Sequence, residues 1–147
     1  MTRQQLWIRG GIGCVAVVIL GIAVMLLLAA PPDAPAATRL QATMARALDA
    51  RYNPVEPTGM FPPGEPFYLS VRIEDAPPNS VVAAKWSYKG AAITQQEQAL
   101  GGEETVYVIG FELRRADAGW PVGEYSVELL LNGQHAGDIR FSVVQTP

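Results

Sequence analysis

The segment Glu124-Tyr125-Ser126-Val127-Glu128-Leu129-Leu130-Leu131 decides the fold class of this chain. Apolar residues occupy every second position in it, namely Tyr125, Val127, Leu129 and Leu131. An apolar–polar alternation with a period of two is typical of a β-strand that buries one face. Asn132-Gly133 follows directly and predicts a tight hairpin turn. The sequence therefore predicts that the chain ends in a β-hairpin lying against a core.

The same alternation recurs upstream and predicts an all-β fold. Strands are expected at 67–73, 81–88, 105–113, 124–131 and 138–144. The stretch 91–100 is ambiguous and suggests an irregular or edge strand around 93–98. The 12 Pro and 14 Gly of the chain suit many turns and disfavour a helical bundle. Six or seven short strands in about 85 residues predict an immunoglobulin-like antiparallel β-sandwich. Trp86 and Tyr125 are the expected core anchors.

The stretch Trp120-Pro121-Val122-Gly123-Glu124-Tyr125-Ser126-Val127-Glu128 resembles the penultimate-strand signature of immunoglobulin-like domains. In that family Gly-x-Tyr forms a tyrosine corner, which implies that the Tyr125 hydroxyl holds the preceding loop.

Residues 54–145 also look like membrane-anchored, immunoglobulin-like ectodomains of uncharacterised bacterial surface proteins. This likeness is carried by Pro54-Val55-Glu56-Pro57-Thr58, by Phe61-Pro62-Pro63-Gly64-Glu65 and by Trp86. The chain lacks the inter-sheet Cys pair of antibody domains, as bacterial members commonly do. The resemblance implies a fold and a location, and it supplies no catalytic residue.

An apolar run from Ile12 to Ala30 predicts a transmembrane signal-anchor helix. The run contains no charge and no Pro. As a helix it would span roughly 28 Å, close to the thickness of a bilayer core. Arg3 and Arg9 precede the run, so residues 1–11 are expected in the cytoplasm and the C-terminal domain outside it. The alternative is a signal peptide cleaved after Ala36. The run exceeds the usual length of about 7–15 residues in such peptides, which favours the retained anchor.

Residues 31–53 are predicted to be a Pro/Ala linker followed by a short amphipathic helix. Thr38 and Gln41 have the spacing of a capping box. Leu40, Met44 and Leu48 recur at every fourth position, as on one face of a helix that ends near residue 51. The outer domain would then comprise residues 54–147.

The composition argues against nucleic-acid binding, metal binding and catalysis. The net charge of −3 offers no attraction to nucleic acid, and the single Cys excludes an internal disulfide. His135 is the only His and is expected in a solvated loop, three residues before Asp138. A catalytic arrangement would need a nucleophilic serine near this loop, but Ser70, Ser87, Ser126 and Ser142 are expected on strands. The acidic pairs Glu74-Asp75 and Glu103-Glu104 hold too few carboxylates for calcium. We predict no catalytic residue, cofactor or metal, and hence no enzyme.

The expected function is therefore that of a non-catalytic, membrane-anchored extracytoplasmic domain that binds another envelope or membrane protein. Trp120, Arg114 and Arg115 are the candidate interaction residues. One alternative is a carbohydrate-binding module, in which Trp120, Tyr68 and Tyr88 would form a flat outward platform. The other is a small accessory subunit of a larger membrane complex.

Overall fold

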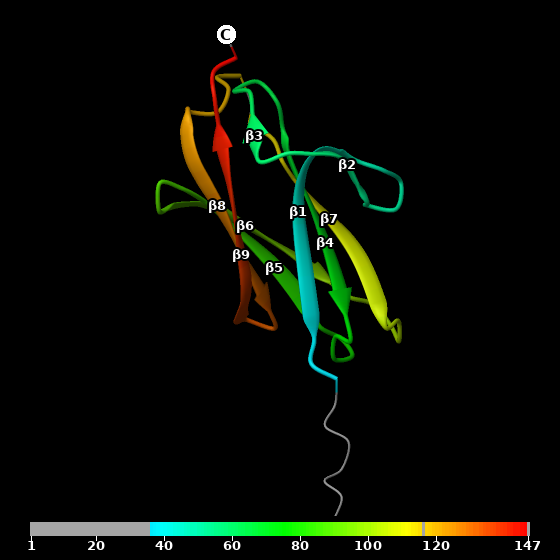
Figure 1. The fold of residues 1–147 in the computed structure, drawn as a ribbon. Helices are drawn as coiled ribbons and strands as arrows, with labels where there is room; N and C mark the ends of the chain where they lie inside the picture. Colours follow the sequence, from blue (N-terminus) through cyan, green and yellow to red (C-terminus); the bar gives the residue numbers. More distant parts are fainter. Residues whose placement is uncertain (1–35, 116, 147) are drawn as a thin grey trace, which may run out of the picture. The chain divides into compact units, whose positions relative to one another are not determined.

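The computed structural model describes residues 36–115 and 117–146, which form a compact unit beginning at Ala36 (Figure 1). Among these residues all regular structure is β. The strands are β1 (Arg39–Leu48), β2 (Pro54–Pro57), β3 (Met60–Phe61), β4 (Phe67–Glu74), β5 (Val81–Tyr88), β6 (Ala91–Ala99), β7 (Val106–Leu113), β8 (Gly123–Leu131) and β9 (Gln134–Val143). No helix able to cross a membrane occurs in the described part of the chain. The apolar run 12–30 lies outside it.

The strands form two sheets, which confirms the predicted all-β, two-sheet fold. One sheet has the order β2-β1-β4-β7 and the other the order β3-β9-β8-β5-β6. The short β3–β9 pair is parallel, whereas the pairs among the longer strands are antiparallel. In the second sheet β5–β6 and β8–β9 are hairpins, and the chain passes from one sheet to the other after β2, β3, β4, β6 and β7. Connections of this kind are those of an immunoglobulin-like sandwich.

The core lies between the two sheets and is built from their alternating inward residues. Val82, Ala84 and Trp86 of β5 are each at most 1% exposed. The Phe67 ring lies at the centre, stacked on Trp120 at 4.4 Å between ring centroids and edge-on to Phe141 at 4.6 Å. Such aromatic pairs stabilise a fold beyond the area they bury.

The predicted helix at 38–51 is wrong, because most of this segment is strand β1. It pairs with β4 residue by residue, from Arg39 opposite Glu74 to Ala45 opposite Tyr68. A spacing of four also fits a strand, since four is a multiple of two. Leu40 and Met44 accordingly face the core from one side of β1. The domain therefore begins near residue 36 and not at residue 54.

The hairpin from β1 to β2 packs across the outer face of the first sheet. The Ser70 hydroxyl donates a 2.7 Å hydrogen bond to the carbonyl oxygen of Tyr52. The side chains of Leu48 and Tyr52 lie so close to Gly110 of β7 that a Cβ there would meet them at 2.6 and 2.7 Å. Leu48, expected in the helix, and Tyr52, expected just after it, thus cover part of a sheet.

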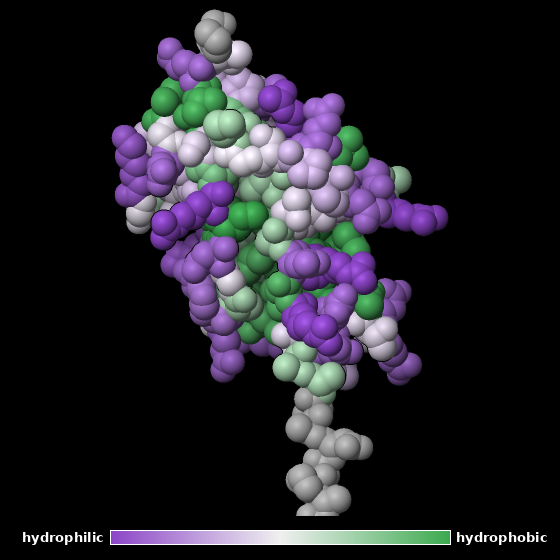
Figure 2. Space-filling model, in the orientation of Figure 1, coloured by the Kyte–Doolittle hydropathy of each residue, from purple (hydrophilic) through white to green (hydrophobic). Residues whose placement is uncertain are grey.

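The register defines two ends of the sandwich. Arg39, where the described chain begins its first strand, lies opposite Glu74, and we call this the near end. Phe67 lies opposite Leu113 at the far end. The β8–β9 turn belongs to the near end, because Leu131 pairs with Val82 beside the start of β5. Figure 2 shows apolar side chains on the side of the sandwich where β1 and β9 lie, with polar side chains on both flanks.

Candidate functional sites

A hollow of about 290 Å³ opens at the far end of the sandwich. It is formed by the loop between β3 and β4, residues 63–66, and by the start of the loop between β7 and β8, including residues 114, 115, 117, 119 and 120. The hollow therefore brings together all three candidate interaction residues, Arg114, Arg115 and Trp120. The opposite wall of the hollow is the loop 63–66, which is distant from residues 114–120 in the sequence. A pattern within one short stretch of sequence could not have assigned this loop to the site.

Trp120 anchors the two loops to each other. Its backbone N–H donates to the Pro63 carbonyl at 2.7 Å, and its indole Nε1–H donates to the Glu65 carbonyl at 3.1 Å. Gly119 has φ of 68°, and a Cβ there would lie 3.0 Å from the Pro63 carbonyl oxygen. Both features favour Gly at this point, because any side chain would be strained there. The hollow is thus held by a buried side chain and a close backbone contact.

Charges of both signs line the hollow. The Arg115 guanidinium lies over the Trp120 ring, 5.9 Å from its centroid. This is the arrangement of a cation–π contact. Arg114 pairs with Glu112 and donates a 3.3 Å hydrogen bond to the Tyr68 hydroxyl. Arg114 and Arg115 are exposed, so their contacts contribute little to stability and they are available for recognition.

The aromatic platform expected of a carbohydrate-binding module is not formed by the three residues proposed for it. The Trp120 side chain is 7% exposed, because its ring stacks on Phe67. Tyr68 is half-buried on β4. Tyr88, on the other sheet, packs its ring against Tyr125 at 4.7 Å and donates to the Val122 carbonyl at 3.0 Å.

Tyr125 holds the loop that carries Trp120. Its hydroxyl donates a 2.7 Å hydrogen bond to the carbonyl of Pro121, four residues upstream. This is the geometry of a tyrosine corner. Burial raises the pKa of the Tyr125 hydroxyl, the nearby Tyr88 raises it further, and Arg115 partly opposes the shift. Trp86 lies elsewhere in the core, 1% exposed, and its Nε1–H donates to Gln96 at 3.0 Å.

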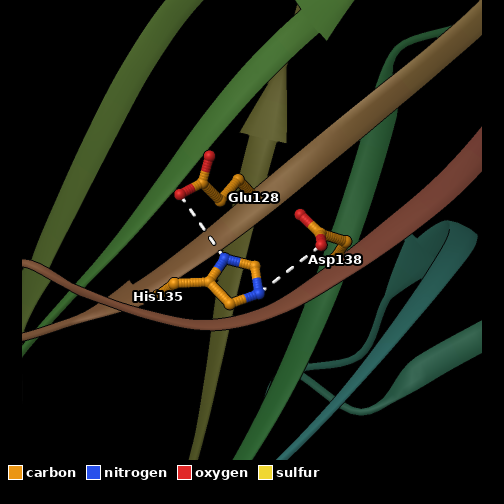
Figure 3. A group of neighbouring side chains, drawn as sticks. All are labelled: Glu128, His135 and Asp138. Carbon is orange, nitrogen blue, oxygen red and sulfur yellow. Dashed lines mark ion pairs between the residues drawn. The ribbon is translucent and has the colours of Figure 1, made fainter.

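A second cluster lies on the outer face of β8 and β9, near the other end of the sandwich. Figure 3 shows His135 between Glu128 and Asp138. His135 Nδ1 is 3.5 Å from a Glu128 oxygen, and Nε2 is 3.5 Å from an Asp138 oxygen. The predicted loop position of His135 is wrong, because β9 begins at Gln134. Glu128 is the member that sequence reasoning missed.

A β-bulge creates this cluster. Leu130 pairs with His135 and Leu129 with Gly137, so Ala136 is an extra residue in β9. Without it, residues 135 and 138 would point to opposite faces, since side chains alternate along a strand. The bulge turns His135 and Asp138 to the same side, where Asp138 stands directly opposite Glu128. The outward position of Glu128 could be read from the sequence, whereas the only hint of the bulge is Gly137, which follows the extra residue.

Comparisons with known proteins place the chain in no family. No protein-family model and no curated protein matches it. An immunoglobulin-like protein from Pseudomonas aeruginosa is 13% identical with a TM-score of 0.49, over 76% of this chain and 99% of that one. The DNA-bound alkylpurine DNA glycosylase AlkC of Pseudomonas fluorescens is 15% identical with a TM-score of 0.46. That match covers 74% of this chain, which spans only 30% of the glycosylase.

Proposed function

We propose that the protein is a single-pass membrane protein whose sandwich lies outside the cytoplasm and binds another envelope or membrane protein. The position of the hollow carries this proposal. It lies at the far end of the sandwich, whereas the described chain starts its first strand at the near end. A domain that is attached to the membrane at one end leaves its opposite end accessible to partners. Binding residues are commonly concentrated on loops that a rigid scaffold holds in place.

The membrane anchor is supported by the apolar run 12–30, and its orientation by Arg3 and Arg9. Residues 1–11 would then be cytoplasmic. Protease added to intact cells should digest the C-terminal domain and spare the N-terminus. A mature protein that begins at Ala37 and is free of the membrane would instead show that the segment is a cleaved signal peptide.

A non-catalytic role is supported by the side chains at the hollow. Among the described residues that line it, the polar side chains are Glu65, Arg114, Arg115, Asp117 and the indole of Trp120. None of these described lining residues is a Ser, Cys or His, and of the two carboxylates Glu65 is paired with Arg46 at 3.6 Å. Arg and Trp are instead the residues enriched where protein partners bind most tightly. The geometry therefore favours protein recognition over catalysis.

A photo-crosslinking amino acid placed at position 115 tests this proposal. The matched control carries the same amino acid at position 95, an exposed site on β6 of the other sheet. We expect crosslinks to a distinct envelope protein from position 115 and none from position 95. The same crosslinks from both positions, or none from either, would contradict a binding site at the hollow. If the partner also co-purifies in fixed ratio in mild detergent, the accessory-subunit form of the proposal is favoured.

A further inference from the structure

The two carboxylates of the second cluster are arranged unfavourably for an isolated pair. Glu128 and Asp138 stand directly opposite each other on neighbouring antiparallel strands. Like charges in this position destabilise a sheet, because their Cβ atoms are only about 5 Å apart. His135 lies between them and faces one carboxylate with each ring nitrogen (Figure 3).

A neutral imidazole can donate a hydrogen bond to only one of the two carboxylates. It carries one N–H donor and one nitrogen lone pair. One ring nitrogen of His135 can therefore donate to its carboxylate, while the lone pair of the other faces a carboxylate oxygen. A cation on that side would be bound by the lone pair and by the carboxylate that it faces, and the other carboxylate, with an oxygen within 4.8 Å of these ligand atoms, would turn toward the same ion.

The distances from the His135 ring to the two carboxylates are longer than those of close, charged hydrogen bonds. Hydrogen bonds between a charged nitrogen and a carboxylate usually measure about 2.7–2.9 Å. Both nitrogen–oxygen distances at His135 are 3.5 Å. Two ligand atoms bound tetrahedrally to one zinc ion, with bonds of about 2.0–2.1 Å, lie roughly 3.4 Å apart. A zinc ion takes only one nitrogen of an imidazole, so one of these two distances matches that of a pair of zinc ligands, and the second carboxylate reaches the same ion by rotation of its side chain.

We propose that Glu128, His135 and Asp138 form a zinc-binding site on the outer face of β8 and β9. One ligand atom from each residue lies within 4.8 Å of the others, so small side-chain rotations bring all three to one ion. A His with two carboxylates suits zinc, and solvent supplies the fourth ligand at this exposed position.

The imidazole of His135 favours zinc over calcium or magnesium. Lys85 stands beside Glu128 on β5, and Arg140 lies two residues after Asp138 on β9. These two positive charges oppose the binding of any dication, so the choice of metal rests on the imidazole ligand. An imidazole nitrogen is in turn a ligand that zinc accepts and that calcium and magnesium rarely use.

Equilibrium dialysis of the full-length protein in detergent tests the site. The protein should carry no polyhistidine tag and be freed of metal with a chelator. It is then dialysed against zinc chloride at a slightly alkaline pH, where an ordinary His is neutral. We expect one zinc ion per chain, with magnesium chloride in excess failing to compete. His135→Ala should weaken zinc binding at least tenfold, and Asp138→Asn and Glu128→Gln should each weaken it severalfold. Glu97→Gln on β6, the matched control, should change it less than twofold.

A spectroscopic measurement separates the site from other acidic groups of the chain. His135 is the only His, so its ring signals can be assigned directly in an NMR titration with zinc chloride. We expect these signals to shift and to saturate at one equivalent. Zinc binding that leaves the ring signals unmoved, affinity unchanged in His135→Ala, or no uptake from zinc in large excess over the protein would each overturn the proposal.

Discussion

The hydroxyl oxygen of Tyr125 lies 2.7 Å from the carbonyl oxygen of Pro121, to which it donates a hydrogen bond. The Tyr125 side chain is 2% exposed, and its ring stacks on Phe141 with 5.4 Å between centroids. Pro121 follows Trp120, the residue that joins the two loops of the far-end hollow. A single side chain therefore links the hydrophobic core to the loop that shapes the hollow.

Substitution of Tyr125 should separate the contributions of its ring and its hydroxyl. Tyr125→Phe keeps the ring and loses the bond to Pro121, so the free energy of unfolding should fall by about 1 kcal/mol. Tyr125→Ala also leaves a cavity and should cost roughly 3–5 kcal/mol. Chemical denaturation of the fragment 36–147 measures both values. An Ala variant within about 0.5 kcal/mol of wild type, the range typical of surface substitutions, would contradict the buried position of the ring.

The first strand should be required for folding. Without β1, the core loses the packing of Leu40 and Met44. Strand β4 also loses one of the two strands to which it is hydrogen-bonded. A fragment of residues 36–147 should therefore unfold cooperatively, whereas a fragment of residues 54–147 should aggregate or lack fixed tertiary structure. Near-ultraviolet circular dichroism distinguishes the two. Equal stability of the two fragments would show that β1 is a dispensable attachment.

The incorrect helix prediction for β1 shows that apolar spacing alone does not always distinguish a helix from a strand. Its residues, RLQATMARAL, are mostly good helix formers, and their apolar spacing fits either a helix or a strand. Pairing with β4 decides the outcome, because β-structure depends on neighbouring strands more than on intrinsic preference. By contrast β4, β5, β7 and β8 were predicted nearly to their ends, since they alternate apolar and polar residues around a single buried face.

The candidate sites also contain residues that the sequence could suggest and residues that only the fold brings together. Arg114, Arg115 and Trp120 are close in sequence, so a local pattern could suggest them together. The loop 63–66 reaches them only through the pairing of β4 with β7. Glu128 and His135 meet only because Ala136 is bulged out of β9, and the one sequence signal for that bulge is the neighbouring Gly137, which is also compatible with a turn.

Gly110 should be intolerant of even one extra carbon. A Cβ at this position would meet side-chain atoms of Leu48 and Tyr52 at 2.6 and 2.7 Å, so these side chains or the β1–β2 hairpin that carries them must shift. We expect Gly110→Ala to lower the free energy of unfolding by about 1–3 kcal/mol, the usual cost of overpacking. Gly137→Ala on β9 is the matched control, because nothing lies within 4 Å of its Cβ position.

A double variant tests the cause of that loss. Tyr52→Ala removes one of the two side chains that obstruct the new methyl group, so its effect combined with Gly110→Ala should be smaller than the sum of the two single effects. Strictly additive values from thermal or chemical unfolding would mean that the hairpin does not press on Gly110.

Stability should fall at alkaline pH through Tyr125. Burial raises the pKa of its hydroxyl above the ordinary value of 10.0, so the folded state keeps the proton at a pH where the unfolded chain releases it. Wherever the folded state binds more protons than the unfolded state, stability decreases as the pH rises. The contribution of Tyr125 to stability is thus complete below about pH 10 and declines from there towards its higher folded pKa.

Tyr125→Phe has no proton to lose, so its free energy of unfolding should fall less steeply than that of wild type between about pH 9.5 and 11. Parallel denaturation curves of the two proteins across this range measure the difference in slope. Equal slopes would show that the Tyr125 hydroxyl ionises as readily in the folded domain as in the unfolded chain.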